Sequence, residues 1–224
     1  MTKIKPSDFN DVPRQSALLD ERKTTKKPFK VECCGMKIVV NPGVYQTSGD
    51  SELIAESVKI NKNENFLEIG CGTGVVSIAV AKRAKNGIGV DINEKAVKTS
   101  KQNADAQGIK NVEFLKSDVF ENVSGKFNVI ICNPPFTKHE ARDNIDRMFW
   151  DPEDEMKRNF FRGVGTFLKP NGKIYFGWVN FADIDVNLPF KLAEKNGYEL
   201  MNKFTRPFGK EFTYYVFEFK SARP

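Results

Sequence analysis

The sequence predicts an α/β protein with a doubly wound, mostly parallel sheet of seven strands. After residue 61, short apolar segments alternate with segments of helical periodicity, an order that is typical of such sheets. Phe127–Cys132 is apolar enough for a strand that is buried on both faces. The first apolar segment runs into closely spaced glycines, which predicts a tight turn between a strand and a helix. A chain of 224 residues, 40% of them hydrophobic, is large enough to form such a core.

Two regions are expected along the chain. Residues 1–43 form a basic N-terminal arm followed by a short hairpin, and residues 44–224 form the main domain. Residues 1–28 are polar and lack a clear period, which predicts a loosely held arm with about one helical turn. The hairpin is expected around Gly35, and the Asn-Pro-Gly sequence at residues 41–43 ends its second strand.

The main domain is expected to begin with a helix over residues 50–60. A later helix starts at Asp151, with a proline in its first turn and acidic residues at the positive end of its dipole, and a turn at residues 169–172 ends it. The expected strands cover residues 66–69, 87–90, 112–115, 127–132, 173–179, 198–203 and 212–220. The other expected helices cover residues 75–84, 93–108 and 188–196.

Histidine and cysteine are scarce, and this excludes several kinds of site. His139 is the only histidine, so a metal site with two His ligands is excluded within one chain. A Ser-His-Asp hydrolase would also have to use His139. The cysteines form no CxxC pair and have no disulfide-like spacing, so we expect neither a metal site nor a disulfide framework. They are Cys33, Cys34, Cys71 and Cys132.

The positive charge of the chain is concentrated near its start. The formal net charge is +6, and residues 1–30 carry eight Lys or Arg against four Asp or Glu. Such an arm could dock on RNA or a ribosome by releasing counterions, or it could be a solvated tail. No apolar run is long enough to cross a membrane, and no apolar signal segment follows the polar start. We therefore expect a cytoplasmic protein without membrane contact.

The turn after the first strand of the sheet contains Gly70, Gly72 and Gly74. Glycines let the backbone approach a ligand where a Cβ would collide with it. The third glycine comes one residue too early for the G-x-G-x-x-G of a dinucleotide site, which disfavours an NAD-dependent dehydrogenase. Glu68, at the start of this segment, would repel a pyrophosphate. The segment therefore favours a cationic ligand.

Acidic residues follow the next two strands. Asp91, with Ile92 beside it, lies about 20 residues after Gly70, where nucleotide-cofactor folds carry a ribose-binding acid. Asp118 can accept a hydrogen bond from an adenine amine, with Val119 against the ring. Contacts to a nucleoside without a phosphate site indicate S-adenosylmethionine.

With these residues in this order, residues 44–220 resemble the class I S-adenosylmethionine-dependent methyltransferases. The resemblance implies a Rossmann-like methyltransferase fold in which the glycine loop holds the methionine part of the cofactor, Asp91 the ribose and Asp118 the adenine. It implies the following cofactor-binding residues: Thr47, Glu68, Gly70, Cys71, Gly72, Thr73, Gly74, Asp91, Ile92, Asp118, Val119 and Asn133.

Asn133-Pro134-Pro135-Phe136 directly follows the fourth strand and resembles the N-P-P-[FY] motif of amino- and amide-nitrogen methyltransferases. The prolines fix the backbone, which presents the Asn133 side-chain oxygen and the Pro134 carbonyl as acceptors. These acceptors would hold an NH2 group whose lone pair is delocalised, and Phe136 can stack on its flat group. The expected catalytic residues are therefore Asn133, Pro134 and Phe136, and no general base is required.

The methyl acceptor is expected to be a macromolecule. Residues 45–53 are similar to the segment before the glycine loop in release-factor glutamine methyltransferases, which favours a protein glutamine. The chain lacks the arginine flanked by prolines and the N-terminal helical domain of the bacterial form. Methyltransferases of rRNA or tRNA bases share N-P-P-[FY], and the basic arm would suit them. A non-catalytic module that binds RNA or the ribosome is an alternative from another class.

Residues 137–150 match no family pattern. The segment is highly charged and ends in Phe149-Trp150. It is either a flexible lid or substrate loop beside the site, or a solvated connection to the next helix.

Overall fold

The structure, a computed structural model, describes residues 4–222. Residues 1–3 and 223–224, which include Lys3 of the basic segment and the outer ends of both expected regions, lie outside the described residues. The strands are β1 Phe29–Cys33, β2 Met36–Val40, β3 Asn65–Ile69, β4 Asn86–Asp91, β5 Val112–Lys116, β6 Phe127–Cys132, β7 Leu168–Val179, β8 Tyr198–Phe208 and β9 Phe212–Ser221. The helices are α1 Val12–Thr24, α2 Gly49–Ser57, α3 Val75–Ala81, α4 Glu94–Ala106, α5 Glu155–Phe167 and α6 Leu188–Lys195, and two 3-10 turns, Asp146–Met148 and Pro152–Asp154, precede α5.

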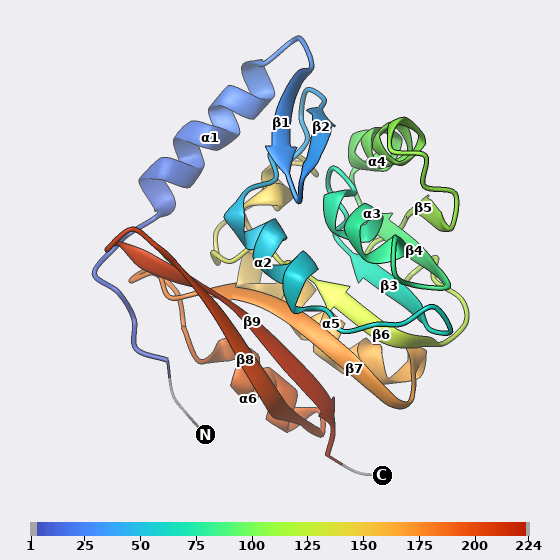
Figure 1. Ribbon diagram of the computed structural model, residues 1–224. Coiled ribbons are helices and arrows are strands. Elements are labelled where there is room, and N and C mark those ends of the chain that lie inside the picture. The colour runs from blue at the N-terminus through green and yellow to red at the C-terminus, as the bar shows by residue number, and fades with distance from the viewer. Residues whose placement is uncertain (1–3, 223–224) are drawn as a thin grey trace.

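Seven strands form the central sheet, in the order β5-β4-β3-β6-β7-β9-β8 (Figure 1). The strands from β5 to β7 pair in parallel, whereas β9 runs antiparallel to both β7 and β8. The predicted doubly wound, mostly parallel sheet of seven strands is therefore confirmed. The strand order reverses between β3 and β6, and in such sheets ligands bind beyond the carboxyl ends of the strands at this point.

Helices cover both faces of the sheet (Figure 1). One hydrophobic cluster joins α2, α3 and α4 to one face, and a second cluster joins α5 and α6 to the other. Every residue of α3 is buried, which fits its sequence of small and β-branched apolar residues. The hairpin of β1 and β2 lies against α4, where Asn103 accepts from the Val39 N–H and donates to the Val39 carbonyl, at 2.9 Å each.

The N-terminal arm differs most from the sequence-based expectation. The prediction of a loosely held arm with about one helical turn was wrong, because Val12–Thr24 is a helix of 13 residues. Residues before it run beside the segment after β7, with the Ser7 N–H bonded to the Asn180 carbonyl and the Ala182 N–H to the Phe9 carbonyl. The division of the chain at residues 43 and 44 stays a prediction.

Smaller differences occur at the ends of elements. The turn expected at residues 169–172 is a bulge inside β7, because Phe127 pairs with Leu168 and Val129 already pairs with Lys173. Helix α3 ends at Ala81, three residues earlier than expected, and β8 continues to Phe208. None of the helices in residues 4–222 combines the length and the apolar character that a membrane span requires.

Candidate active site

A cavity of about 300 Å³ opens at the carboxyl ends of β3, β4, β5 and β6. It is lined by all the residues that the sequence predicted for cofactor binding and catalysis, with the exception of Gly74. These lining residues are Thr47, Glu68, Gly70, Cys71, Gly72, Thr73, Asp91, Ile92, Asp118, Val119, Asn133, Pro134 and Phe136. The structure thus brings the predicted residues together in one place, and their roles stay predictions.

The glycine loop adopts a backbone that other residues rarely adopt. Gly70, Gly72 and Gly74 have φ angles of 76°, 54° and 79°, in the left-handed region that favours glycine. Gly74 is the cap residue before α3, and a Cβ there would lie 2.9 Å from the Cβ of Ser100. Gly74 therefore shapes the loop from outside the cavity. The N–H groups of Gly70 and Cys71 both donate to the Val90 carbonyl, which fixes the loop to β4.

Glu68 is buried beneath the glycine loop, with 2% of its surface exposed. Burial raises the pKa of this carboxyl to about 8, although the Ser77 hydroxyl donates a hydrogen bond to it. The folded protein therefore favours the protonated form of Glu68 more strongly than an exposed glutamate would. A cation bound nearby would favour the charged form and draw the pKa down.

Asp91 lies where β4 ends. Its carboxylate accepts hydrogen bonds from the N–H groups of Gly72 at 2.9 Å and Asn93 at 2.8 Å, while burial raises its pKa. These contacts fix the carboxylate beside the glycine loop. After β5, Val119 has a φ of 45°, an unusual value for a β-branched residue, and lines the cavity together with Asp118.

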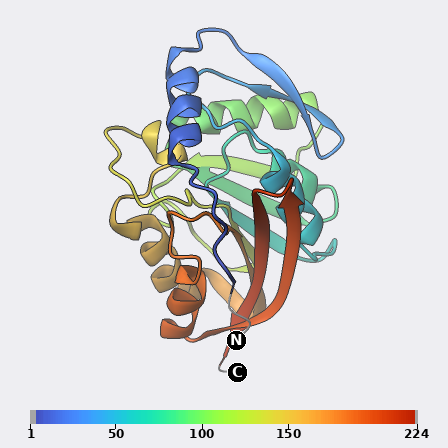
Figure 2. The same ribbon diagram turned by 90° about the vertical axis from the view of Figure 1, so that its left-hand side faces the viewer.

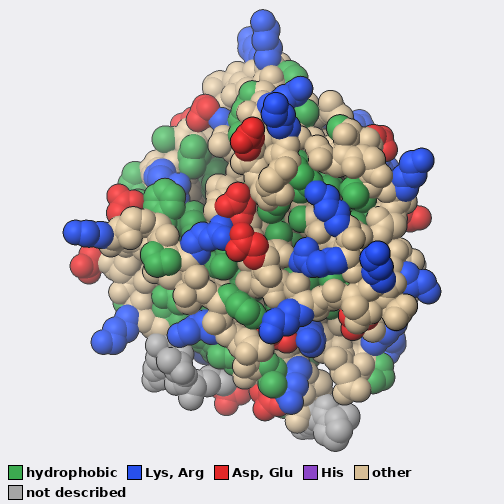
Figure 3. Space-filling model, in the orientation of Figure 1, with side chains coloured by type: hydrophobic (Ala, Val, Ile, Leu, Met, Phe, Trp, Pro, Cys, Tyr) green, Lys and Arg blue, Asp and Glu red, His purple; other side chains and the backbone are tan. Residues whose placement is uncertain are grey.

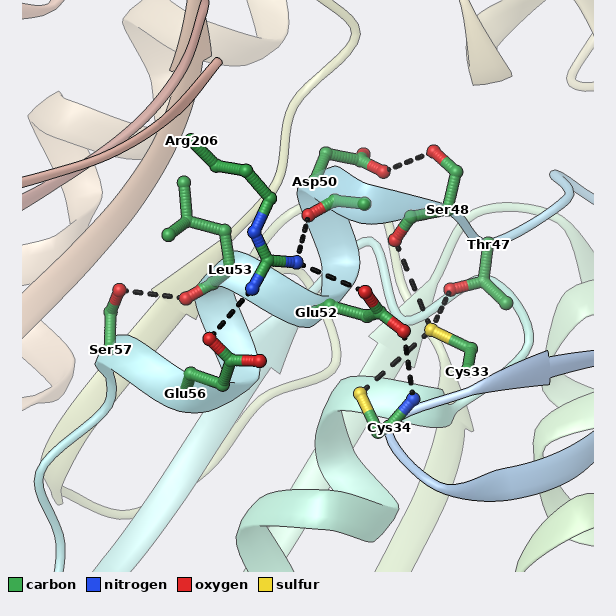
Figure 4. Close-up of polar contacts among 11 residues, drawn as sticks. Cys33, Cys34, Thr47, Ser48, Asp50, Glu52, Leu53, Glu56, Ser57 and Arg206 are labelled. Carbon is green, nitrogen blue, oxygen red and sulfur yellow. Dashed lines mark hydrogen bonds and ion pairs between the residues drawn. The ribbon is translucent and has the colours of Figure 1, made fainter. Parts of the chain in front are cut away.

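Asn133 follows β6, and its side-chain amide is fixed by Asp50. The Nδ2 group donates to the Asp50 carboxylate at 2.6 Å, and a carboxylate can only accept, so the amide orientation is determined. Asp50, which is 3% exposed, also accepts hydrogen bonds from Ser48 and Tyr45. Figure 4 shows Asp50 beside Ser48 at the start of α2.

Helix α2 is fastened to β8 along its length. Arg206 forms ion pairs with Glu52 at 3.0 Å and with Glu56 at 2.7 Å (Figure 4). On the opposite side of α2, the Cys33 thiol lies 3.4 Å from the Thr47 hydroxyl. These contacts hold the segment that carries Asp50 at the cavity.

The Asn133 Oδ1 atom is buried and has no hydrogen-bond partner within the described chain. It packs against Gly177 of β7, where an added Cβ would lie 2.4 Å from this oxygen. A buried acceptor without a partner costs free energy, and a bound N–H donor would satisfy it. Asn133, which lines the cavity and which the sequence predicts to hold the methyl acceptor, therefore has an unused acceptor atom.

Phe136 is held by aromatic neighbours. Its ring meets Trp178 edge-on at 6.0 Å between centroids and Phe181 at 6.2 Å. The ring is partly exposed and lines the cavity, which agrees with the predicted contact to a flat substrate group. That contact itself stays a prediction.

Helix α1 forms a second wall of the cavity, which the sequence did not reveal. Gln15 and Arg22 are 3% and 4% exposed, and Gln15 Oε1 and two Arg22 nitrogens have no hydrogen-bond partner among residues 4–222. The lining residues from α1 and its cap are Asp11, Arg14, Gln15, Leu18 and Arg22. These residues lie on one face of the helix. Because most of them are polar, the sequence shows no apolar helical period in this segment. On the face in Figure 3, the Lys and Arg side chains of the described residues are scattered and gather in no separate patch.

The segment of residues 137–150 packs against α1 (Figure 2). Phe149 and Trp150 are buried with Leu19, so this end of the segment is not solvated, whereas residues 138–140 and 142–144 are exposed. Lys23 of α1 pairs with Asp143 at 3.1 Å and with Asp146. His139 is exposed and lies against the Trp150 ring. Residues 4–222 contain no cluster of three or more His, Cys, Asp or Glu that could hold a metal ion.

Comparison with known proteins agrees with this arrangement. Residues 35–205, which contain the glycine loop and Asn133, match the methyltransferase small domain. The chain belongs to this family. The predicted methyltransferase is therefore confirmed at the level of the family, and the match begins within the hairpin.

Two relatives carry names that concern glutamine. A Methanocaldococcus jannaschii protein, named as a protein N5-glutamine methyltransferase, is 46% identical over 117 residues, which cover 52% of this chain and 59% of the relative. The release factor glutamine methyltransferase of Fusobacterium nucleatum is 26% identical over 89% of this chain and 61% of its own length. The matches thus span about three fifths of the length of these relatives.

A solved structure shares the fold. It is a 16S rRNA methyltransferase from Thermus thermophilus in complex with AdoMet and guanosine. The TM-score is 0.62 at 20% identity, and the match covers 88% of this chain and 50% of that one. At this identity the likeness concerns the fold, which is the predicted Rossmann-like methyltransferase fold.

Proposed function

We propose that this protein transfers the methyl group of S-adenosylmethionine to the side-chain amide nitrogen of a glutamine in another protein. The Asn133 amide carries the proposal, since Asp50 accepts a hydrogen bond from its nitrogen at 2.6 Å and its oxygen is buried without a partner among residues 4–222. An NH2 group is the donor that such an oxygen lacks. The family supports methyl transfer, and the names of the two relatives support glutamine as the acceptor.

The residues around the cavity fit S-adenosylmethionine, which supplies an electrophilic methyl group on a positively charged sulfur. The glycine loop offers a close backbone approach, and Asp91 offers a carboxylate for ribose hydroxyls. Glu68 lies under the loop, where it can become charged beside a cation. Asp118 and Val119 line the same cavity and would contact the adenine.

The residues at the end of β6 would prepare the acceptor nitrogen. Asn133 Oδ1 and the Pro134 carbonyl accept its two N–H hydrogens and hold it in line with the methyl group. Such alignment supplies about 7–11 kcal/mol of the barrier. Transfer forms an N–C bond, breaks the S–C bond and releases one proton from the nitrogen to water. Because the proton leaves after the methyl group arrives, the residues need not include a general base.

Labelled S-adenosylmethionine tests the proposal. The protein is incubated with the labelled cofactor and a cell extract, and the products are treated with protease or with ribonuclease. We expect protease treatment to convert the labelled macromolecule into small labelled fragments, and ribonuclease treatment to leave it intact. The protein hydrolysate should contain methylglutamine. Label that ribonuclease releases would show an RNA acceptor instead. No incorporation into any macromolecule would favour the non-catalytic binding module.

A further inference from the structure

Lys157, in the first turn of α5, has a fully buried side chain with 0% exposure. Lysine is almost never fully buried unless it is paired. Its ammonium donates to the Pro135 carbonyl at 2.9 Å and forms ion pairs with Asp151 at 3.0 Å and Asp154 at 3.2 Å. Three acceptors thus match the three N–H donors of the ammonium.

The two carboxylates are themselves fixed by the start of α5. Asp151 accepts hydrogen bonds from the N–H groups of Met156 at 2.9 Å and Lys157 at 3.2 Å. Glu153 and Asp154 have φ angles of 52° and 57°, a left-handed backbone that is uncommon outside glycine. This turn brings the Asp154 carboxylate to the ammonium. The helix therefore determines where the Lys157 nitrogen lies.

The same end of α5 holds the chain on both sides of Phe136. Lys157 binds the Pro135 carbonyl before it, and the Asp151 N–H binds the Thr137 carbonyl after it, at 3.0 Å. Prolines fix φ but leave ψ free, so a bond to the Pro135 carbonyl sets the remaining rotation at that residue. The Lys157 ammonium also lies 5.8 Å from the Trp178 ring, which contacts Phe136.

We propose that Lys157 is a positioning residue that holds the loop of residues 133–136 in its reactive arrangement. Asp50 fixes the loop at Asn133, and Lys157 fixes it at Pro135, so the Pro134 carbonyl between them has one position. This inference rests on the proposed function, which gives that carbonyl its role. A buried ion cluster is a weak stabilising element that apolar residues often replace without loss, so stability alone does not account for Lys157.

The test uses a background in which the carboxylates cannot be left unpaired. Lys157→Met and Lys157→Gln are each combined with Asp151→Asn and Asp154→Asn, and asparagine tolerates the left-handed backbone at residue 154. Both variants should unfold at or above the temperature of the parent double variant, because the parent leaves the buried Lys157 ammonium without a carboxylate, and they should bind S-adenosylmethionine within about twofold of it. The Met variant should lose about 100-fold in kcat, since small misplacements of reacting groups have effects of this size. The Gln variant can still donate to the Pro135 carbonyl and should recover part of kcat.

Hydrogen–deuterium exchange gives a second readout that needs no acceptor. Exchange at residues 136 and 137 should rise about tenfold in the Met variant and less in the Gln variant. Lys173→Met is the control, because it removes a partly exposed ion pair with Glu218 on the far part of the sheet. Equal kcat and equal exchange in the Met variant and its parent would overturn the inference. If the wild-type protein transfers no methyl group at all, the proposed function fails, and exchange alone still decides whether Lys157 holds the loop.

Discussion

The two walls of the cavity are built in different ways. The first wall consists of strand ends, where the glycine loop is bonded to β4 and Asn133 is fixed by a buried carboxylate. The second wall consists of α1 and the segment of residues 137–150, joined by a small apolar cluster around Leu19 and by the ion pairs of Lys23. Backbone hydrogen bonds inside a sheet open only when the whole domain unfolds. A helix that packs on a small apolar cluster can instead detach by local unfolding.

This difference assigns different tasks to the two walls. The strand-end wall should set the rate of methyl transfer, because it places the reacting groups. The α1 wall should affect access and local stability. Changes in the first wall are therefore expected to have larger effects on turnover than changes in the second.

The largest effect is expected for Asn133→Ala. Loss of the side-chain acceptor should lower kcat by about 10²–10³, the range seen when one preorganised hydrogen-bonding group is removed from an active site. Affinity for S-adenosylmethionine, measured by calorimetry, should change little. Asn128→Ala, at the opposite end of the same strand, is the control. A variant without Asn133 that turns over at the normal rate would contradict the role of the strand-end wall.

Gly177→Ala should have the next largest effect. The new Cβ would meet Asn133 Oδ1 at 2.4 Å and Ile54 at 2.8 Å, so the amide must move. Displacement of a reacting group by about 1 Å can lower the rate about 100-fold. Gly49→Ala is the matched control, since its Cβ would have no neighbour closer than 3.9 Å. Single-turnover rates of the two variants make the comparison, and equal rates would show that the amide position is not critical.

A pH dependence of stability is expected from Glu68. Its folded-state pKa of about 8 lies above the ordinary value near 4.3. At pH values between the two, the folded protein therefore binds up to one more proton than the unfolded protein. The free energy of unfolding should therefore fall as pH rises towards 8, by at most about 1.4 kcal/mol per pH unit, and then level off. Glu68→Gln should remove this part of the slope. Urea denaturation from pH 6 to 9 measures it, and identical slopes for both proteins would refute the assignment.

The smallest effect on turnover is expected for Lys23→Met in the α1 wall. Loss of its pairs with Asp143 and Asp146 should lower the free energy of unfolding by about 1–3 kcal/mol, because the Asp146 side chain is 1% exposed and loses a charged partner. Amide exchange in α1 should increase, while kcat should stay within about twofold. Lys27→Met, which removes an exposed charge from the same region, is the control. A kcat that falls as far as in Asn133→Ala would remove the distinction between the walls.

The strand-end wall was predictable because its signals are local. Glycines at residues 70, 72 and 74, and Asp91 after the next strand, have spacings that the topology of the sheet imposes. Parallel strands bring their carboxyl ends to one edge, so residues far apart in sequence could be placed together. The proline-rich loop after β6 was found in the same way.

The α1 wall was not predictable because its inner face is polar. Buried residues of this helix are Gln15, Leu19 and Arg22, so the apolar period that marks an amphipathic helix is missing. Lys157 gave no signal for a related reason. A lysine in a helix normally indicates a solvated face, and only the fold shows that two aspartates and a carbonyl surround it.

The contacts of α1 have a consequence for the order in which the molecule is assembled during synthesis. Leu19 packs on Phe149 and Trp150, and the N–H of Asp11 binds Asp183, so the partners of this early helix leave the ribosome more than a hundred residues later. Contacts between such distant residues carry a large loop-closure entropy and form slowly. The part of the chain that is translated first is therefore among the last to find its place.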